Sequence, residues 1–155
     1  MRSAHAARRI DGGLVVADCI FCKIVAGEIP SVRVWEDDDV IAFLDINPLT
    51  VGHTLVVPRA HVEQLTDLPG ESAAALMRPV PALAAAIVAV TGAEGFNVLQ
   101  NNGRCAGQAV GHVHVHIIPR RPDDGLGYRW PAQPADPEQL ERLREAIQNR
   151  LTEMD

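Results

Sequence analysis

His112-Val113-His114-Val115-His116-Ile117-Ile118-Pro119 is the stretch of sequence that decides the fold of this chain. Histidine alternates with an apolar residue, and this period of two predicts a β-strand that carries all three imidazoles on one face. Neighbouring members of such a row lie roughly 6.5–7 Å apart. The chain has 6 histidines, so half of them fall in this strand. Because histidine changes its charge near neutral pH, the row offers a nucleophile, a proton donor and a metal ligand together.

The composition around this strand is that of an ordinary globular domain. The 155 residues suit one domain, with 47% hydrophobic and 22% charged residues. A net charge of −6 argues against a broad nucleic-acid surface, and 4% aromatic residues leave little for stacking bases. No apolar run approaches the roughly 20 residues of a membrane helix. We therefore expect neither a nucleic acid nor a membrane as partner, and a cytoplasmic location.

Other segments of the chain predict a mixed fold. We expect further strands at 32–36, 40–44, 53–58 and 95–100, and a long helix at 71–90 that Pro79 and Pro81 kink. A final helix is expected with Asp136 as its cap and Pro137 in its first turn, and it carries an apolar stripe formed by Leu140, Leu143, Ile147 and Leu151. The prediction is an α+β fold with a mainly antiparallel sheet. Residues 1–17 are expected to form a flexible tail, a short transit peptide being the alternative.

A polar loop before the histidine strand suits a phosphate. Residues 101–108 contain two glycines, whose loop can turn backbone N–H groups toward an anion. Asn101 and Gln108 add neutral donors, and a neutral imidazole can attack phosphorus. These features predict phosphoryl or nucleotidyl transfer through a covalent phospho-histidine. Two alternatives stay open, namely a strand whose histidines only face solvent or a partner, and a hydrolase that holds a catalytic zinc between them.

The 3 cysteines, Cys19, Cys22 and Cys105, indicate a metal rather than a set of disulfides. Cys19 and Cys22 have the spacing of a metal knuckle, and no strand precedes them as a redox pair would require. His61 and His112 are the candidates for the two remaining ligands. The sequence thus predicts a closed Cys2His2 zinc site, with two buried reduced cysteines as the alternative.

The ordered set of motifs resembles the histidine triad (HIT) superfamily of nucleotide hydrolases and transferases, in its zinc-carrying bacterial type. Its signature alternates histidine with apolar residues, as residues 112–118 do. The resemblance covers about residues 19–120 and includes Cys19-Ile20-Phe21-Cys22, Phe43-Leu44-Asp45-Ile46, Gly52-His53-Thr54-Leu55, Asn101-Asn102-Gly103 and Gly107-Gln108. It implies a five-stranded antiparallel sheet with one long helix and a C-terminal helix, paired as a homodimer.

The resemblance also implies the roles of single residues. His114 would attack the α-phosphorus of a purine nucleotide, typically an adenylyl group, and His116 and Gln108 would assist it. The nucleotide would be bound by Asp45, Ile46, His53, Asn101, Gly107, Gln108, Ala109, His114 and His116. Cys19, Cys22, His61 and His112 would hold a structural zinc, and no organic cofactor is implied. The domain would span 18–155, with a C-terminal extension from about residue 120 in which Tyr128-Arg129-Trp130 lies near the substrate.

One position departs from the family. Ala109 stands where members that cleave P–N bonds often have a serine, and alanine cannot assist an amine leaving group. A phosphoramidate, a dinucleoside polyphosphate and a mixed anhydride such as adenylyl-sulfate are therefore comparable expected substrates. The alternative function is a nucleotide-binding sensor or scaffold with little turnover.

Overall fold

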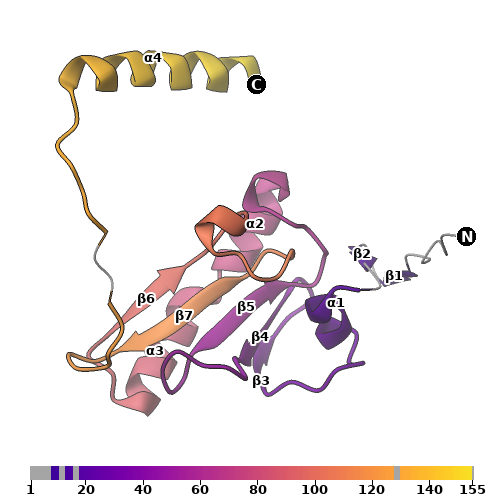
Figure 1. The fold of residues 1–155 in the computed structure, drawn as a ribbon. Coiled ribbons are helices and arrows are strands. Elements are labelled where there is room, and N and C mark those ends of the chain that lie inside the picture. The colour runs from indigo at the N-terminus through magenta and orange to yellow at the C-terminus, as the bar shows by residue number, and fades with distance from the viewer. Residues whose placement is uncertain (1–7, 11–12, 16–17, 128–129, 155) are drawn as a thin grey trace, which may run out of the picture. The chain divides into compact units, whose positions relative to one another are not determined.

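The computed structural model of the chain describes residues 8–10, 13–15, 18–127 and 130–154, and Figure 1 shows its elements. These residues divide into two units, Met1–Gly125 and Leu126–Asp155. The first unit contains one five-stranded antiparallel sheet, with the strand order β3-β4-β5-β7-β6. Its strands are β3 (Arg33–Glu36), β4 (Val40–Leu44), β5 (Thr54–Pro58), β6 (Gly95–Leu99) and β7 (Val115–Arg120).

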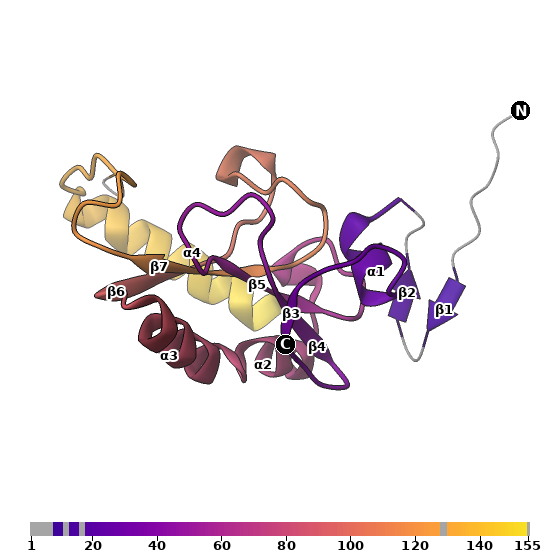
Figure 2. The same ribbon diagram turned by 90° about the horizontal axis from the view of Figure 1, so that it is seen from below.

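The two faces of the sheet are covered by different helices. α2 (Gly70–Met77) and α3 (Val80–Thr91) pack on one face, where Leu76 and Leu83 meet Val56 and Ile117 in a buried cluster. Figure 2 shows these two helices together on one side of the sheet. α1 (Ile20–Val25) packs on the other face, where Phe21 and Ile24 meet the strand residues of opposite parity, among them Phe43 and Leu55. The triad strand β7 lies between β5 and β6, so both of its edges are paired.

The α+β prediction and its antiparallel sheet are confirmed, and two elements differ from the prediction by more than one residue at an end. The helix expected at 71–90 is two helices, because Pro79 cannot donate a backbone hydrogen bond and separates α2 from α3. The triad strand begins only at Val115, two residues later than expected. Before it, Val113 donates a hydrogen bond to the carbonyl of Val62 (2.8 Å). The residues just before β7 are therefore held by a hydrogen bond to the segment after β5 and not by pairing with a neighbouring strand.

The segment Gly70–Thr91 corrects the statement that no apolar run of the chain approaches the length of a membrane helix. It is long and apolar enough, by length and composition alone, to cross a membrane. One face is the core face of α2 and α3, and this explains part of its hydropathy. The opposite face is exposed and equally apolar, with Ala82, Ala86 and Val90 outward.

The remaining elements are a pair of short strands, two 3-10 turns and a C-terminal helix. β1 (Arg8–Ile10) and β2 (Gly13–Val15) pair within the predicted N-terminal tail, of which residues 1–7, 11–12 and 16–17 lie outside the described residues. The 3-10 turns η1 (Leu65–Asp67) and η2 (Arg104–Ala106) shape two loops. In the second unit, α4 (Pro137–Met154) begins where expected, since Asp136 accepts a hydrogen bond from the backbone of Glu138 (3.1 Å).

Candidate functional site

The four predicted metal ligands converge. Cys19 and Cys22 flank the start of α1, His61 follows β5, and His112 precedes β7. The His112 Nδ1 lies 3.4 Å from the Cys19 Sγ, 3.7 Å from the Cys22 Sγ and 3.3 Å from the His61 Nδ1. The Cys22 Sγ and His61 Nδ1 are 3.3 Å apart. Segments up to 93 residues apart in the chain thus bring four ligand atoms within 4.8 Å of one another.

The donor set and its spacing fit zinc. With bonds of about 2.0–2.1 Å to nitrogen and about 2.3 Å to sulfur, a tetrahedral ion needs neighbouring ligand atoms about 3.3–3.8 Å apart. The four contacts above fall in this interval. The His112 Nε2 lies 2.9 Å from the Pro58 carbonyl oxygen, to which it must donate, so its Nδ1 is left with the lone pair that a metal needs. Two thiols and two imidazoles form a closed ligand set of the structural type.

His114 presents an unprotonated nitrogen. Its Nδ1 lies 2.7 Å from the backbone carbonyl oxygen of His112, which can only accept a hydrogen bond. The proton of the neutral ring is therefore on Nδ1, and Nε2 has a free lone pair. The ring of Phe21 stands edge-on to it, with centroids 5.1 Å apart, and limits its rotation. His114 is buried and lies next to the less buried His116, with the two ring centroids 4.8 Å apart.

His116 has the opposite arrangement. The backbone N–H of Leu49 donates to the Nδ1 of His53 (3.2 Å), so the proton of neutral His53 is on Nε2. That Nε2 lies 2.9 Å from the Nδ1 of His116 and donates to it. The proton of His116 is therefore on its Nε2. Two neighbouring imidazoles thus differ in kind, because one offers a lone pair and the other an N–H.

Burial keeps these rings neutral. It lowers the pKa of His114 and of His53, and it lowers the pKa of His116 to about 4. The carboxylate of Asp45 opposes this effect at all three rings without cancelling it. At neutral pH the lone pair on His114 is consequently available for attack.

Asp45, His53 and His116 form a second cluster of potential metal ligands, but their contacts argue against a metal. The Nε2 of His53 already donates a hydrogen bond to the Nδ1 of His116, so neither of these two nitrogens has a lone pair free for a metal. The Oδ1 of Asp45 accepts from the backbone of Asn47 (2.8 Å), and its Oδ2 is 3.6 Å from the His53 Nδ1. Among the described residues, the three histidines of the triad do not form one ligand cluster, and this disfavours a catalytic zinc held by all three.

The loop after β6 is closed by the side chain of Gln108. Its Oε1 accepts from the backbone N–H of Gly103 (2.7 Å), and its Nε2 donates to the carbonyl of Glu63 (2.7 Å). Gly103 and Gly107 have φ angles of +79° and +88°, which favour glycine. Gln108 therefore holds the loop, and one hydrogen of its amide remains for a ligand.

The other predicted nucleotide residues differ in exposure. Ile46 is 82% exposed and Ala109 is exposed, whereas Asn101 is half-buried next to Gly107. Tyr128 and Arg129 lie outside the described residues, and Trp130 is exposed.

Several groups that orient the site had not been predicted. The carbonyls of Pro58 and His112 and the N–H of Leu49 set the proton positions of three imidazoles. Backbone groups are present at every residue, so no side-chain pattern marks them. Phe21 belongs to a quoted motif, but only the packing of α1 on the sheet brings it to His114.

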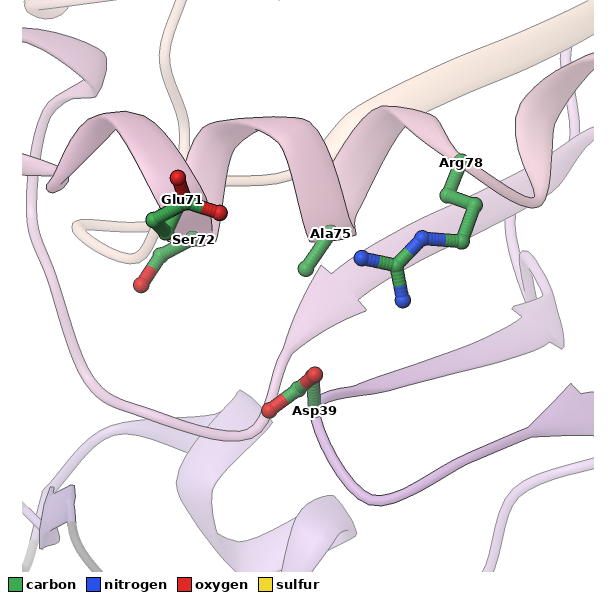
Figure 3. A pocket seen from close by; sticks show the side chains of 5 residues that line it. All are labelled: Asp39, Glu71, Ser72, Ala75 and Arg78. Atoms are coloured by element: carbon green, nitrogen blue, oxygen red, sulfur yellow. The ribbon is translucent and has the colours of Figure 1, made fainter.

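A separate hollow of about 180 Å³ lies between α2 and the turn from β3 to β4. In Figure 3, Asp39 of the turn lies opposite Ala75 and Arg78 of α2. The hollow is lined by charges of both signs and by none of the histidines, so it has no part in the chemistry above.

Comparison with known proteins gives a family and named relatives. Residues 26–123 match the HIT domain. Adenosine 5'-monophosphoramidase hnt1 of Schizosaccharomyces pombe is 46% identical over 134 residues, covering 86% of this chain and 98% of the relative. Adenylylsulfatase HINT3 of Arabidopsis thaliana is 40% identical over 140 residues, covering 90% of this chain and 70% of the relative.

Solved structures give the same result. A member of the HIT family of proteins from Bacillus subtilis has a TM-score of 0.82 and 46% identity, covering 86% of this chain and 96% of that chain. A zinc-bound histidine triad family protein from Mycobacterium smegmatis has a TM-score of 0.65 and 38% identity, covering 89% of this chain and 98% of that chain.

Proposed function

The chain belongs to the HIT family, and from this premise we propose that it hydrolyses an adenylyl derivative through a covalent intermediate on His114. The relatives named as a monophosphoramidase and as an adenylylsulfatase support an enzyme that acts on the α-phosphorus of AMP derivatives. The observation that carries the proposal is the hydrogen bond between the His114 Nδ1 and the His112 carbonyl, because it leaves Nε2 unprotonated.

The proposed reaction has two steps. The lone pair on His114 Nε2 forms a bond to the α-phosphorus, and the bond from phosphorus to the leaving group breaks. His116, which is neutral and carries its proton on Nε2, donates a hydrogen bond from there to the leaving group as the bond to phosphorus breaks. Water then attacks the phosphorus and the N–P bond breaks, and the proton that the water loses reaches the leaving group through solvent. The products are AMP and the protonated leaving group.

The substrate would be held by groups around the two histidines. We propose that Asp45 binds the ribose hydroxyls, with Ile46 against the base and the remaining amide hydrogen of Gln108 near the scissile bond. Asn101, Gly107 and Ala109 would line the phosphate, and His53 would orient His116. Since Ala109 has no hydroxyl, an anhydride such as adenylyl-sulfate is as suitable a substrate as a phosphoramidate.

The structural zinc is part of the proposal. Cys19, Cys22, His61 and His112 fit the ion in chemistry and spacing, and a zinc-bound relative supports it. When bound, zinc would cross-link the N-terminal segment to the sheet and fix His112, whose carbonyl orients His114. Reduced thiols suit the cytoplasm, which we propose as the compartment.

We further propose a homodimer. β6 is an edge strand on which Phe96 and Val98 are 47% and 42% exposed, and Val90 on α3 is 88% exposed. An apolar sheet edge beside an apolar helix face is suited to pairing with a second copy. For the domains, we propose residues 1–17 as a tail and 18–155 as one HIT domain with a C-terminal extension.

The test of the reaction is His114→Ala. We expect turnover of adenylyl-sulfate and of AMP phosphoramidate to fall at least about 10³-fold, because the attacking atom is removed, while the affinity for AMP changes little. Radiolabelled substrate should leave a trapped adenylyl adduct on the wild-type protein and none on the variant. Wild-type turnover in the variant would refute the mechanism. AMP binding with no wild-type turnover of either substrate would instead favour a nucleotide sensor.

A further inference from the structure

The loop after β6 carries one positive charge, on Arg104. Residues 45–53 and 101–119 contain every side chain proposed to bind the substrate, and they include no other arginine and no lysine. Asn101 and Gln108 are neutral donors, and Asp45 is an acid. A substrate that brings negative charge beyond its α-phosphate therefore meets a single cationic side chain on these two segments, at position 104.

The loop that carries Arg104 is fixed to the segment before β7. The side chain of Gln108 binds the N–H of Gly103 and the carbonyl of Glu63 (2.7 Å each). The carbonyl of the residue before Glu63 accepts a hydrogen bond from Val113 (2.8 Å), which is the chain neighbour of the attacking histidine. In Figure 2 this loop and the turn between β4 and β5 lie on the same side of the sheet, away from α2 and α3.

The backbone of Arg104 is held in place, whereas its side chain is free. Its carbonyl accepts from the N–H of Gly107 (3.0 Å), and the carbonyl of Gly103 accepts from Ala106 (3.2 Å) and Gln108 (3.1 Å). The side chain of Arg104 is exposed and makes no hydrogen bond or ion pair with any residue that the structure describes. It can therefore turn toward a bound anion without breaking an existing contact.

The other arginines of residues 18–125 have partners or lie elsewhere. Four of the six bind an acid or a backbone carbonyl, and these are Arg33, Arg59, Arg120 and Arg121. Arg78 has no such partner, but it lines the hollow beside α2, which contains none of the histidines. Glu63 does not neutralise Arg104, because its carboxylate lies beside Gly111. Within this range, Arg104 is thus the unpaired arginine that belongs to a segment of the proposed site.

The charge on Arg104 selects a class of leaving group. A guanidinium matches two oxygens of a sulfate or a phosphate with two parallel N–H donors, but it gains no such contact from an amine. Building on the proposed reaction, we propose that Arg104 is a specificity-determining residue that binds the negatively charged leaving group of an AMP anhydride. Negative charge grows on the leaving oxygen as its bond to the α-phosphorus breaks, and the guanidinium stabilises that charge. Ala109, which has no hydroxyl to assist an amine, favours the same class of substrate.

Two substrates with the same adenylyl group test this role. Adenylyl-sulfate releases sulfate, an anion, whereas AMP phosphoramidate releases ammonia. We expect Arg104→Gln to lower kcat/KM for adenylyl-sulfate about 10-fold and to change kcat/KM for the phosphoramidate by less than about 2-fold. Arg104→Lys keeps the charge and should recover part of the loss. Diadenosine triphosphate, which releases a nucleoside diphosphate, tells the two anions apart, because the better-matched anion shows the greater loss in Arg104→Gln.

Arg78→Gln is the matched control. It removes the same charge from an exposed arginine away from the histidines, so both kcat/KM values should stay at the wild-type level. An equal change for both substrates in Arg104→Gln, or no change for either, overturns the proposal, as does an equal effect of Arg78→Gln. Turnover of AMP phosphoramidate by the wild type would uphold the proposed reaction in each of these cases. No turnover of any of the three substrates by the wild type would refute the reaction, and this inference with it.

Discussion

At the scale of single residues, one side-chain type performs different tasks because backbone groups fix where each proton lies. The carbonyl of Pro58 leaves a lone pair on the Nδ1 of His112, toward the cysteines. The carbonyl of His112 leaves one on the Nε2 of His114. His53 donates to His116 and leaves the proton of that ring on Nε2. Three rings at alternate positions thus differ in the nitrogen that carries a lone pair, which is Nδ1 on His112, Nε2 on His114 and Nδ1 on His116.

Removal of a ligand tests the zinc site. We expect Cys22→Ser to lose zinc, measured by elemental analysis, and to lower the melting temperature by several degrees, because the N-terminal segment is released from the sheet. Cys105→Ser is the matched control. Cys105 is an exposed thiol outside the cluster, so its zinc content and melting temperature should match the wild type. Full zinc occupancy in Cys22→Ser would contradict the proposed ligand set.

The depressed pKa of His116 predicts how stability depends on pH. Burial lowers this pKa from 6.5 to about 4, so between these values the unfolded chain binds a proton that the folded chain does not. The free energy of unfolding should therefore fall as the pH drops from about 6.5 to about 4.

His116→Gln removes this proton-binding site and keeps a polar side chain that can accept a hydrogen bond from His53. Urea unfolding should show a shallower loss of stability in the variant, by at most about 1.4 kcal/mol per pH unit. The comparison cancels effects that both proteins share, such as protonation of the zinc ligands. Parallel curves for the two proteins would show that the pKa of His116 is not depressed.

The sequence indicated which cysteines and histidines come together, but not how each ring is oriented. The alternation of histidines and the pair Cys19 and Cys22 are patterns of residue type, and residue type is what a sequence states. Which nitrogen of His114 is unprotonated depends on the backbone carbonyl of His112, 2.7 Å from its Nδ1. Every residue has a backbone carbonyl, so no pattern of residue types marks this one. Gln108 was predicted as a donor to phosphate, yet both ends of its amide also hold the loop, and only the folded chain reveals this second task.

At the scale of elements, the turn before β5 connects the site to the helical layer. Thr50 donates to the carbonyl of Pro119 at the end of β7 (2.7 Å), and Leu49 donates to His53. Gly52 lies between Thr50 and His53 in the chain and has a φ angle of +93°. A Cβ added at Gly52 would lie 2.7 Å from the Cγ2 of Thr91 on α3. The sequence predicted β5 because residues 53–58 alternate and end at a proline, but it could not predict this close approach, which depends on how α3 packs.

We therefore expect Gly52→Ala to destabilise the protein by about 2–4 kcal/mol, since it adds backbone strain and a steric overlap. Gly27→Ala is the matched control. Gly27 also has a positive φ angle (+76°), but an added Cβ meets nothing within 4 Å. It should cost only about 1 kcal/mol. Urea unfolding of the two variants measures the difference, and equal losses would show that the contact with Thr91 is relieved without cost.

At the scale of the whole molecule, the proposed homodimer depends on one apolar surface, the outer face of α3 beside the edge of β6. The segment Gly70–Thr91 has two apolar faces, of which one meets the sheet and the other is exposed. The sequence predicted the stripe on α4 from its helical period. It could not predict which face of α3 is exposed, because nearly every residue of α3 is apolar and no period distinguishes its faces.

Val90→Glu tests the face on α3. A carboxylate at this 88% exposed position would be desolvated in the dimer and not in the monomer, so we expect the dissociation constant of the dimer to rise at least 10-fold. Val32→Glu is the control, since Val32 is 62% exposed but precedes β3 on the opposite side of the sheet order. Analytical ultracentrifugation measures the dissociation constants of both variants. A dimer that Val90→Glu leaves as tight as the wild type would place the interface elsewhere.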